Sequence, residues 1–164
     1  ALVGNIEINN RSQLRRNATS IADGSLYGLN KIDFSDLRAK LDTANSSNIN
    51  YIELNKDNCN TLIAAADQNL CTELFETIWS NLTFTSAQYK IYIFNYSLTS
   101  TQQSQLYANG SIEQQARDVI LNDADINAAV DTTDVPDLMR VVIWIDYYDQ
   151  PEQYVTLVGL VFNE

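Results

Sequence analysis

The stretch "DADINAAVDTTD", residues 123–134, places side-chain oxygens at the spacing that calcium ligation requires. With the first aspartate as position one, oxygen-bearing side chains fall at positions one, three, five, nine and twelve, and the carbonyl of Ala129 falls at position seven. Calcium takes six to eight oxygen ligands and tolerates variable geometry. The pattern therefore indicates a candidate metal site, with calcium as the one candidate cofactor, formed by Asp123, Asp125, Asn127, Asp131 and Asp134.

The loop resembles an EF-hand calcium loop, with two departures from its pattern. Position six is Ala128 where glycine permits the sharp turn, and position twelve is Asp134 where a longer glutamate chelates with two oxygens. The alternative is the acidic end of a helix that runs into a loop closed by Pro136. Both interpretations stay open.

Residues for catalysis are scarce in this chain. The 164-residue sequence contains no histidine, which removes the commonest general base, the commonest zinc ligand and every His-dependent triad. It also lacks the glycine-rich phosphate-binding motifs and the nucleophile elbow of hydrolases. Asp146 and Asp149 could form a carboxylate pair for glycoside hydrolysis, but such pairs are unavoidable among 21 acidic residues. We predict a protein that is not an enzyme, with no catalytic residues.

The charge is strongly and unevenly negative. The formal net charge is −11, which would repel phosphate backbones and excludes nucleic acid as an expected partner. From Ser111 to the end, 11 acidic residues face only Arg117 and Arg140. A solvated acidic surface that aids solubility explains this pattern. An alternative function is an acidic inhibitor or immunity protein that binds a basic partner through its carboxyl-terminal surface.

Cys59 and Cys71 are the only two thiols, so a single disulfide is expected if the compartment is oxidising. In one continuous helix the pair would lie about 18 Å apart, beyond the reach of a disulfide. The bridge therefore requires a chain reversal, which we expect around 67–69. The alternative is two buried thiols that act as small apolar residues.

Asn-x-Ser/Thr occurs six times, where about two or three would arise by chance in a chain rich in these residues. One reading is glycan attachment outside the cytoplasm, and the other is an Asn- and Ser/Thr-rich surface. The first predicts an extracellular or cell-surface glycoprotein. The candidate sites are Asn10, Asn17, Asn45, Asn81, Asn95 and Asn109.

The amino-terminal segment "ALVGNIEINNRSQLRR" passes from apolar residues to a polar stretch with three arginines. A chain cut just outside a hydrophobic segment would look like this, as would a mature end or a cloning scar. No stretch of this sequence is long and apolar enough to span a membrane. We therefore expect membrane contact only through a segment absent from this chain.

Hydrophobic periodicity predicts several helices. One covers 11–29, with Gly24 and Gly28 forming a notch for another backbone, and Ser35 is expected to cap a second helix over 36–44. Residues 61–82 form one helix or two with a single apolar stripe. Ser111 and Gln114 form a capping-box pattern that starts another helix, ending near residue 121.

Strict alternation predicts strands over 49–55, 88–98, 138–148 and 154–162, the last two joined as a β-hairpin through a turn at 149–151. In the strand over 88–98, one face carries Tyr89, Ile91 and Ile93. The other face carries Tyr92, Phe94 and Tyr96. The fold class is α+β, with an amino-terminal helix and further helices packed on an antiparallel sheet of at least three strands. We predict one domain over 1–164: a helical part at 1–41, a strand and helix region at 42–87, and the sheet with an inserted helix at 88–164.

Aromatic side chains on the second face of the strands need a partner. Aromatics with a polar end are favoured at interfaces, so this face forms a candidate subunit interface. The alternative is that further helices or loops of the same chain cover it. The residues concerned are Tyr92, Tyr96, Trp144 and Tyr148.

Taken together, the arginine-marked helix beside an apolar stub ("RSQLRRNATSIADGSLYGL") and the strands "YKIYIFNYS", "MRVVIWIDYY" and "YVTLVGLVF" resemble the extracellular portion of archaeal type IV pilin-like surface proteins. The resemblance implies a pilin-like or minor-pilin role in structure or adhesion. It also implies a helix that anchors in a membrane or packs in a filament core, and a displayed sheet domain. Its partners would be other subunits of a surface filament. A further alternative, from the aromatics and the loop at 123–134, is a calcium-dependent carbohydrate-binding module.

Overall fold

The computed structural model describes residues 2–43, 50–77, 88–122, 137–149 and 152–163; for 2–11, 66, 76–77, 148–149 and 152 it describes the backbone alone. Four antiparallel strands form one sheet in the order β1-β2-β3-β4, with bounds Tyr51–Leu54, Tyr89–Asn95, Leu138–Asp149 and Glu152–Phe162. The helices are α1 (Leu2–Leu29), α2 (Phe34–Thr43), α3 (Cys59–Leu62), α4 (Gln68–Thr72), α5 (Ser100–Ala108) and α6 (Gln114–Leu121). A 3₁₀ turn η1 (Ala65–Asp67) and a π-helical turn η2 (Glu73–Thr77) flank α4.

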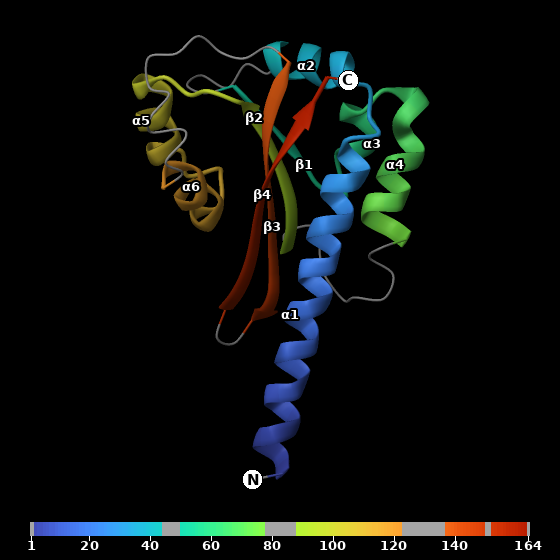
Figure 1. Ribbon diagram of the computed structural model, residues 1–164, viewed down its shortest axis with the longest axis vertical. Coiled ribbons are helices and arrows are strands. Elements are labelled where there is room, and N and C mark those ends of the chain that lie inside the picture. Colours follow the sequence, from blue (N-terminus) through green and yellow to red (C-terminus); the bar gives the residue numbers. More distant parts are fainter. Residues whose placement is uncertain (1, 44–49, 78–87, 123–136, 150–151, 164) are drawn as a thin grey trace.

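The molecule has three layers, with the sheet in the middle. Figure 1 looks at the sheet from its β4 side, with α5 and α6 on one face and α1, α3 and α4 on the other. This arrangement confirms the predicted α+β class and the predicted hairpin of β3 and β4. The sequence analysis did not predict α5, which begins with a capping box between Thr99 and Gln102.

The larger core lies between the sheet and α1 to α4. Tyr89, Ile91 and Ile93 of β2 enter it, and Ile91 lies opposite Ile143 of β3 in the register. All five residues that alternation placed on one face of β3 are buried in this core, namely Met139, Val141, Ile143, Ile145 and Tyr147. Helix α1 contributes residues at helical spacing, namely Ala18, Ile21, Ala22 and Leu29. The buried Ser25 hydroxyl hydrogen-bonds to the Tyr89 hydroxyl between α1 and β2.

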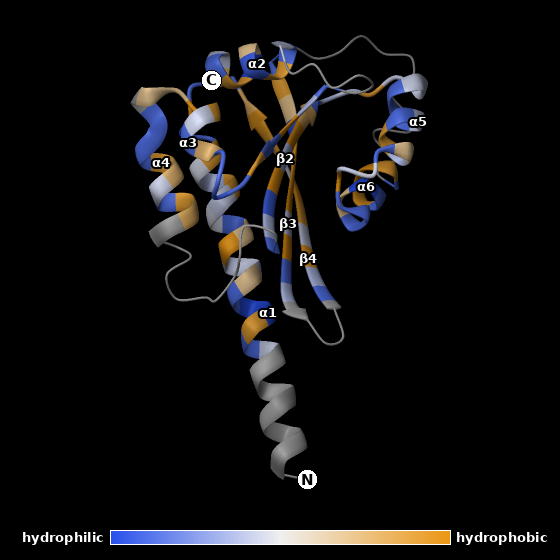
Figure 2. Cartoon of the chain, turned by 180° about the vertical axis from the view of Figure 1, so that it is seen from behind, coloured by the Kyte–Doolittle hydropathy of each residue, from blue (hydrophilic) through white to orange (hydrophobic). Residues whose placement is uncertain are grey.

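A second core lies on the opposite face, beneath α5 and α6. Tyr92 and Phe94 of β2 meet Leu106 of α5 and Ile120 of α6 there, all fully buried. Figure 2 shows hydrophobic residues along the strands and a mixture of hydrophilic and hydrophobic residues in the helices. Rings occur on both faces of β2 because each face closes a separate core.

Helix α1 is longer than predicted, and its described side chains pack on the core from Leu14 to Leu29. It starts at Leu2 rather than near Arg11, and its first turns extend past the lower ends of β3 and β4 in Figure 1. At Gly28, the second glycine of the notch predicted from Gly24 and Gly28, no backbone of another described element approaches within 4 Å of the Cβ position. Instead, a Cβ on Gly28 would lie 3.0 Å from Leu74 Cδ2, so a side chain of η2 fills the space.

Two predicted helix caps are wrong. At α2 the side chain of Asp33, not Ser35, accepts hydrogen bonds from the backbone of Ser35 and Asp36. The Ser35 hydroxyl also donates to that carboxylate, which lowers the pKa of Asp33. Helix α6 begins at Gln114, so Ser111 lies outside its first turn and caps nothing. Ser111 instead donates its N–H to the Asn109 side chain in the preceding turn.

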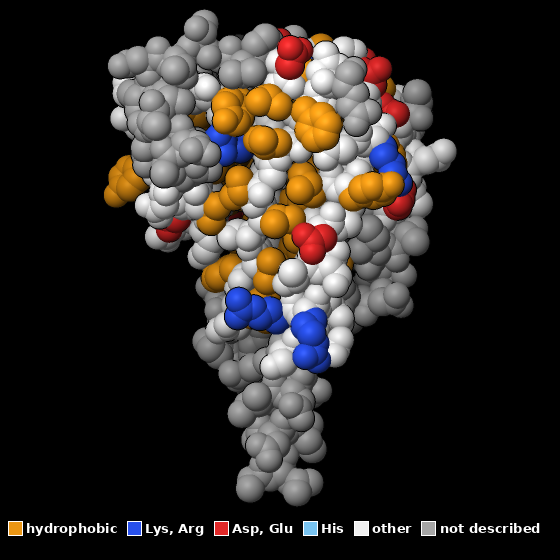
Figure 3. All heavy atoms as spheres, viewed as in Figure 1, with side chains coloured by type: hydrophobic (Ala, Val, Ile, Leu, Met, Phe, Trp, Pro, Cys, Tyr) orange, Lys and Arg blue, Asp and Glu red, His pale blue; other side chains and the backbone are white. Residues whose placement is uncertain are grey.

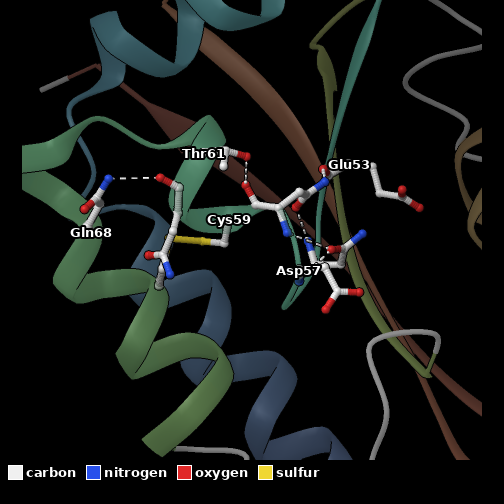
Figure 4. The surroundings of a disulfide bond; sticks show 9 residues. Glu53, Asp57, Cys59, Thr61 and Gln68 are labelled. Atoms are coloured by element: carbon white, nitrogen blue, oxygen red, sulfur yellow. Dashed lines mark hydrogen bonds between the residues drawn. A yellow bond between two sulfur atoms is a disulfide. The ribbon is translucent and has the colours of Figure 1, made fainter.

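The predicted disulfide between Cys59 and Cys71 is present, with Cα atoms 5.7 Å apart (Figure 4). The chain reverses earlier than predicted, because α3 ends at Leu62 and Ile63 and Ala64 are extended before the η1 turn. The Gln68 side chain donates to the Asn60 carbonyl at 2.9 Å and ties α4 to α3 beside the bridge.

Candidate interaction surface

The outer side of β4 from Gln153 to Asn163, called here the β4 edge, is an open sheet edge. Among the described strands, β4 pairs only with β3. No residue from Gln153 to Asn163 is charged. Leu160 and Phe162 are 37 % and 48 % exposed, and Figure 3 shows hydrophobic side chains gathered over this side of the molecule. An apolar strand of this length with a free edge is a ready template for pairing.

The hydrogen bonds between β4 and β3 determine which backbone groups of β4 point away from the sheet. The Asn163 N–H donates to the Asp137 carbonyl at 3.0 Å, toward β3. Because backbone groups alternate along a strand, the outward-pointing groups belong to Thr156, Val158, Leu160 and Phe162. The Leu160 carbonyl agrees with this phase, since it accepts a 3.5 Å hydrogen bond from the Asn30 side chain of α1 rather than from β3.

Helix α1 runs beside the β4 edge in the same direction as β4. Arg15, Thr19 and Asp23 line a shallow groove of about 320 Å³ with residues 154–157. Further along, Leu26 lies against Gly159, and Asn30 reaches Leu160. The order of these contacts places Arg15 near the start of β4 and the end of α1 near the end of β4. In Figure 3, lysine or arginine side chains accordingly lie at the lower end of this surface.

A charged cluster joins β1, β2 and α6 on the other face of the sheet. The Lys90 ammonium lies 2.7 Å from Glu113 and 3.7 Å from Glu53, with a side chain 18 % exposed. It also lies 5.7 Å from the centre of the Trp144 ring. The Glu113 N–H donates to the Tyr92 hydroxyl at 3.2 Å. The cluster anchors the start of α6 to the sheet, and sequence reasoning missed it although Lys90 is a lone charge in an apolar strand.

The tyrosines beside this cluster are unsuited to act as bases. Burial raises the pKa of Tyr92 well above its usual range, and the neighbouring carboxylates add to the effect. Burial, followed by the charge of Glu53, raises the pKa of Tyr51. Both phenols therefore stay protonated at neutral pH and serve as hydrogen-bonding groups.

The aromatic interface predicted from the sequence does not form a surface. Tyr92 is fully buried and Trp144 is 4 % exposed, because α5 and α6 cover them. Trp144 also donates its indole N–H to the Gln115 side chain of α6. Tyr96 is half-buried with the Arg140 guanidinium over its ring, and the Tyr148 side chain lies outside the described residues. Helices of the same chain, the alternative weighed earlier, account for this face.

The candidate calcium ligands, Asp123, Asp125, Asn127, Asp131 and Asp134, all lie outside the described residues. Within the part of the chain that the structure describes, no cluster of three or more acidic or cysteine side chains is arranged to hold a metal. Calcium at residues 123–134 therefore stays a prediction.

The glycosylation candidates differ in position. Asn17 is half-buried on α1 and accepts a hydrogen bond from Gln13, whereas Asn109 lies in the turn between α5 and α6. At Asn95 the sequon is obstructed, because Ser97 is buried at the end of β2. The Asn10 side chain, Asn45 and Asn81 lie outside the described residues. All three described asparagines are half-buried, and Asn109 is the one that lies in a turn.

A hollow of about 410 Å³ lies between α2 and the segment after α3. Its lining is mainly apolar, with Ile32, Leu37 and Ile63 at its base and Asp36 and Lys40 at its rim. The residues that line this hollow include no nucleophile paired with a base, so we assign it no catalytic role.

No protein-family model, curated protein or solved structure matches this chain. Within the described residues, no helix combines the length and apolar character needed to cross a membrane.

Proposed function

We propose that this protein is a non-catalytic, pilin-like subunit displayed outside the cell, where it serves a structural or adhesive role. The observation that carries the proposal is the placement of α1. The helix has 28 residues, or about 42 Å at the usual rise, and among its described side chains Leu14 is the first that packs against the main core. Its first turns extend beyond the sheet, so one part of the helix holds the domain while the other is available for anchoring or assembly (Figure 1).

Two further observations support display outside the cell. The Cys59–Cys71 disulfide is of a kind that persists in oxidising compartments and is rare in the cytosol. The Asn109 sequon lies in a turn, where an attached glycan would not disturb a helix or strand. An anchored subunit of a filament would also present its sheet domain away from the membrane.

The decisive test is the gene sequence upstream of Ala1. A leader followed by about 20 apolar residues, enough to span a bilayer, is the expected result. An initiator methionine codon close to the Ala1 codon, beside a gene for a basic toxin, would contradict the proposal and favour the acidic inhibitor. Labelling intact cells with a membrane-impermeant amine reagent gives a second readout, because a displayed protein is labelled without lysis.

A further inference from the structure

We propose that the β4 edge binds a second copy of this chain, by antiparallel pairing of β4 with β4 about a two-fold axis. The proposal goes beyond the role proposed above and does not depend on it. A two-fold contact is self-complementary, so one patch supplies both sides. The β4 edge meets this requirement through the outward-pointing backbone groups of Thr156, Val158 and Phe162, its lack of charge and the position of α1 beside it.

Charge selects this edge for self-association. Two copies that each carry a net charge of −11 repel each other wherever acidic surfaces meet. Natural sheet edges are usually protected by charged residues, lysine above all, and the β4 edge has none between Gln153 and Asn163. Strand β4 itself therefore brings no charges into the contact, and Asp23 of α1 is the acidic side chain that lies beside it.

The uncharged stretch also defines the register. Pairing all of 153–163 with itself places Val158 opposite Val158 of the second copy, on the axis. Thr156 then lies opposite Leu160, and Tyr154 opposite Phe162, on the same face of the extended sheet. The outward-pointing groups of Thr156, Val158 and Leu160 become the hydrogen-bonded pairs of the new ladder, and the Asn30 side chain gives up its long contact with Leu160.

The same axis brings the two α1 helices side by side and antiparallel, because α1 lies on β3 and β4 and runs along β4. Arg15 lies near the start of β4, so it meets the part of the second copy that follows its α1 helix. That segment carries the exposed Asp33 and Asp36. Arg15 of each copy therefore faces acidic side chains at both ends of the contact, while Asp23, which lines the groove beside residues 154–157, lies nearer the axis.

The contact area is adequate for a specific dimer. Eleven residues of β4 extend over about 37 Å at the usual rise per residue. A sheet edge with an adjoining helix is about 20 Å across, which gives on the order of 700 Å² per copy. Standard interfaces bury about 800 Å² per partner, so the edge approaches that size before loops are counted.

The antiparallel arrangement of the dimer determines where the two α1 helices point. Antiparallel β4 strands direct the amino-terminal ends of the two α1 helices away from each other. If the helix is the anchored end, as proposed above, the pair joins molecules on two facing surfaces rather than neighbours in one filament. Only this last step depends on the proposed function.

The test is the oligomeric state of the 164-residue chain with its disulfide intact, measured by sedimentation equilibrium up to about 1 mM, the weak end of specific association. The expected species has twice the 18.5 kDa mass of one chain. The variant T156E/L160E places glutamates opposite each other in two cross-strand pairs and should weaken the dimer about tenfold or more. The variant T156K/L160E substitutes the same positions with opposite charges and should restore it.

Two controls keep the result specific. Y107E changes a side chain that is 73 % exposed on α5, away from β4, and should leave the dimer unchanged. Amide exchange at Val158 and Leu160 should slow as the wild-type concentration rises, which reports pairing without any substitution. A wild-type chain that stays monomeric overturns the proposal and leaves the edge to an extended segment of another protein. A T156E/L160E dimer as tight as the wild type also overturns it.

Discussion

Gly159 of β4 lies directly against Leu26 of α1, so closely that a Cβ on the glycine would approach Leu26 Cδ2 to 2.5 Å. This contact sets how near α1 can come to the β3–β4 hairpin. The glycine is therefore required by a close approach rather than by a turn. The same packing holds the carboxyl-terminal half of α1 on the sheet while the helix extends beyond it (Figure 1).

We expect Gly159→Ala to destabilise the protein by about 1–3 kcal/mol, the usual range for overpacking a close contact. Urea unfolding monitored by circular dichroism gives the free energy of unfolding. Leu26→Ala is the matched second substitution, because it removes the side chain that the new methyl group meets. The double variant should lose less stability than the sum of the two single variants. Strict additivity would show that Leu26 is not the obstacle.

Gly110→Ala is the control for this comparison. No atom lies within 4 Å of a Cβ built there, so the substitution should change the stability by less than about 0.5 kcal/mol, as is usual at open surface sites.

The sheet was predictable because its signal is local. Met139, Val141 and Ile143 alternate with residues of the second core, and period-two alternation fixes both the strand and its inward face. Helix α5 was missed because "STQQSQLYA" has almost no apolar periodicity and buries only Leu106. Its Thr99–Gln102 capping box was the available signal, whereas the same motif at Ser111 caps no helix.

The sites were less predictable than the sheet, because they depend on which elements meet. The contact of Lys90 with Glu113 joins residues 23 positions apart. The burial of Tyr92 and Trp144 depends on α5 and α6 covering that face, which no pattern within β2 or β3 records. The absence of charge along β4 was visible in the sequence, but its meaning required the strand order, which places β4 at an edge.

Removing the disulfide should destabilise the protein without changing its fold. The Cys59 and Cys71 crosslink closes a loop of 12 residues, for which the entropy of the unfolded chain predicts a loss of about 3 kcal/mol. The measurement compares urea unfolding of the wild type with C59A/C71A. Mass spectrometry of the alkylated wild type without reductant should find no free thiol. Equal stability of the two proteins would mean that the bridge constrains little.

Lys90→Met should destabilise the protein, because it leaves the Glu53 and Glu113 carboxylates facing each other without their shared cation. The cluster is partly exposed, so we expect about 1–3 kcal/mol, less than for a fully buried pair. The triple variant with Glu53→Gln and Glu113→Gln is the matched control, and it should recover part of the loss. If the triple variant were the least stable, hydrogen bonding rather than charge would dominate the cluster.

Stability should fall above about pH 10, where unperturbed tyrosines ionise. Burial raises the pKa of Tyr89 and Tyr92 in the folded protein, so both stay protonated there while the unfolded chain loses these protons. Their contribution is complete below the unfolded pKa and is lost as pH rises toward the folded pKa, at up to about 1.4 kcal/mol per pH unit for each tyrosine. Urea unfolding from pH 8 to pH 11 measures the slope. Y92F should make the fall in stability with pH less steep. Y107F, which changes an exposed side chain, should leave the slope unchanged. Equal slopes in the wild type and both variants would contradict the assignment to Tyr92.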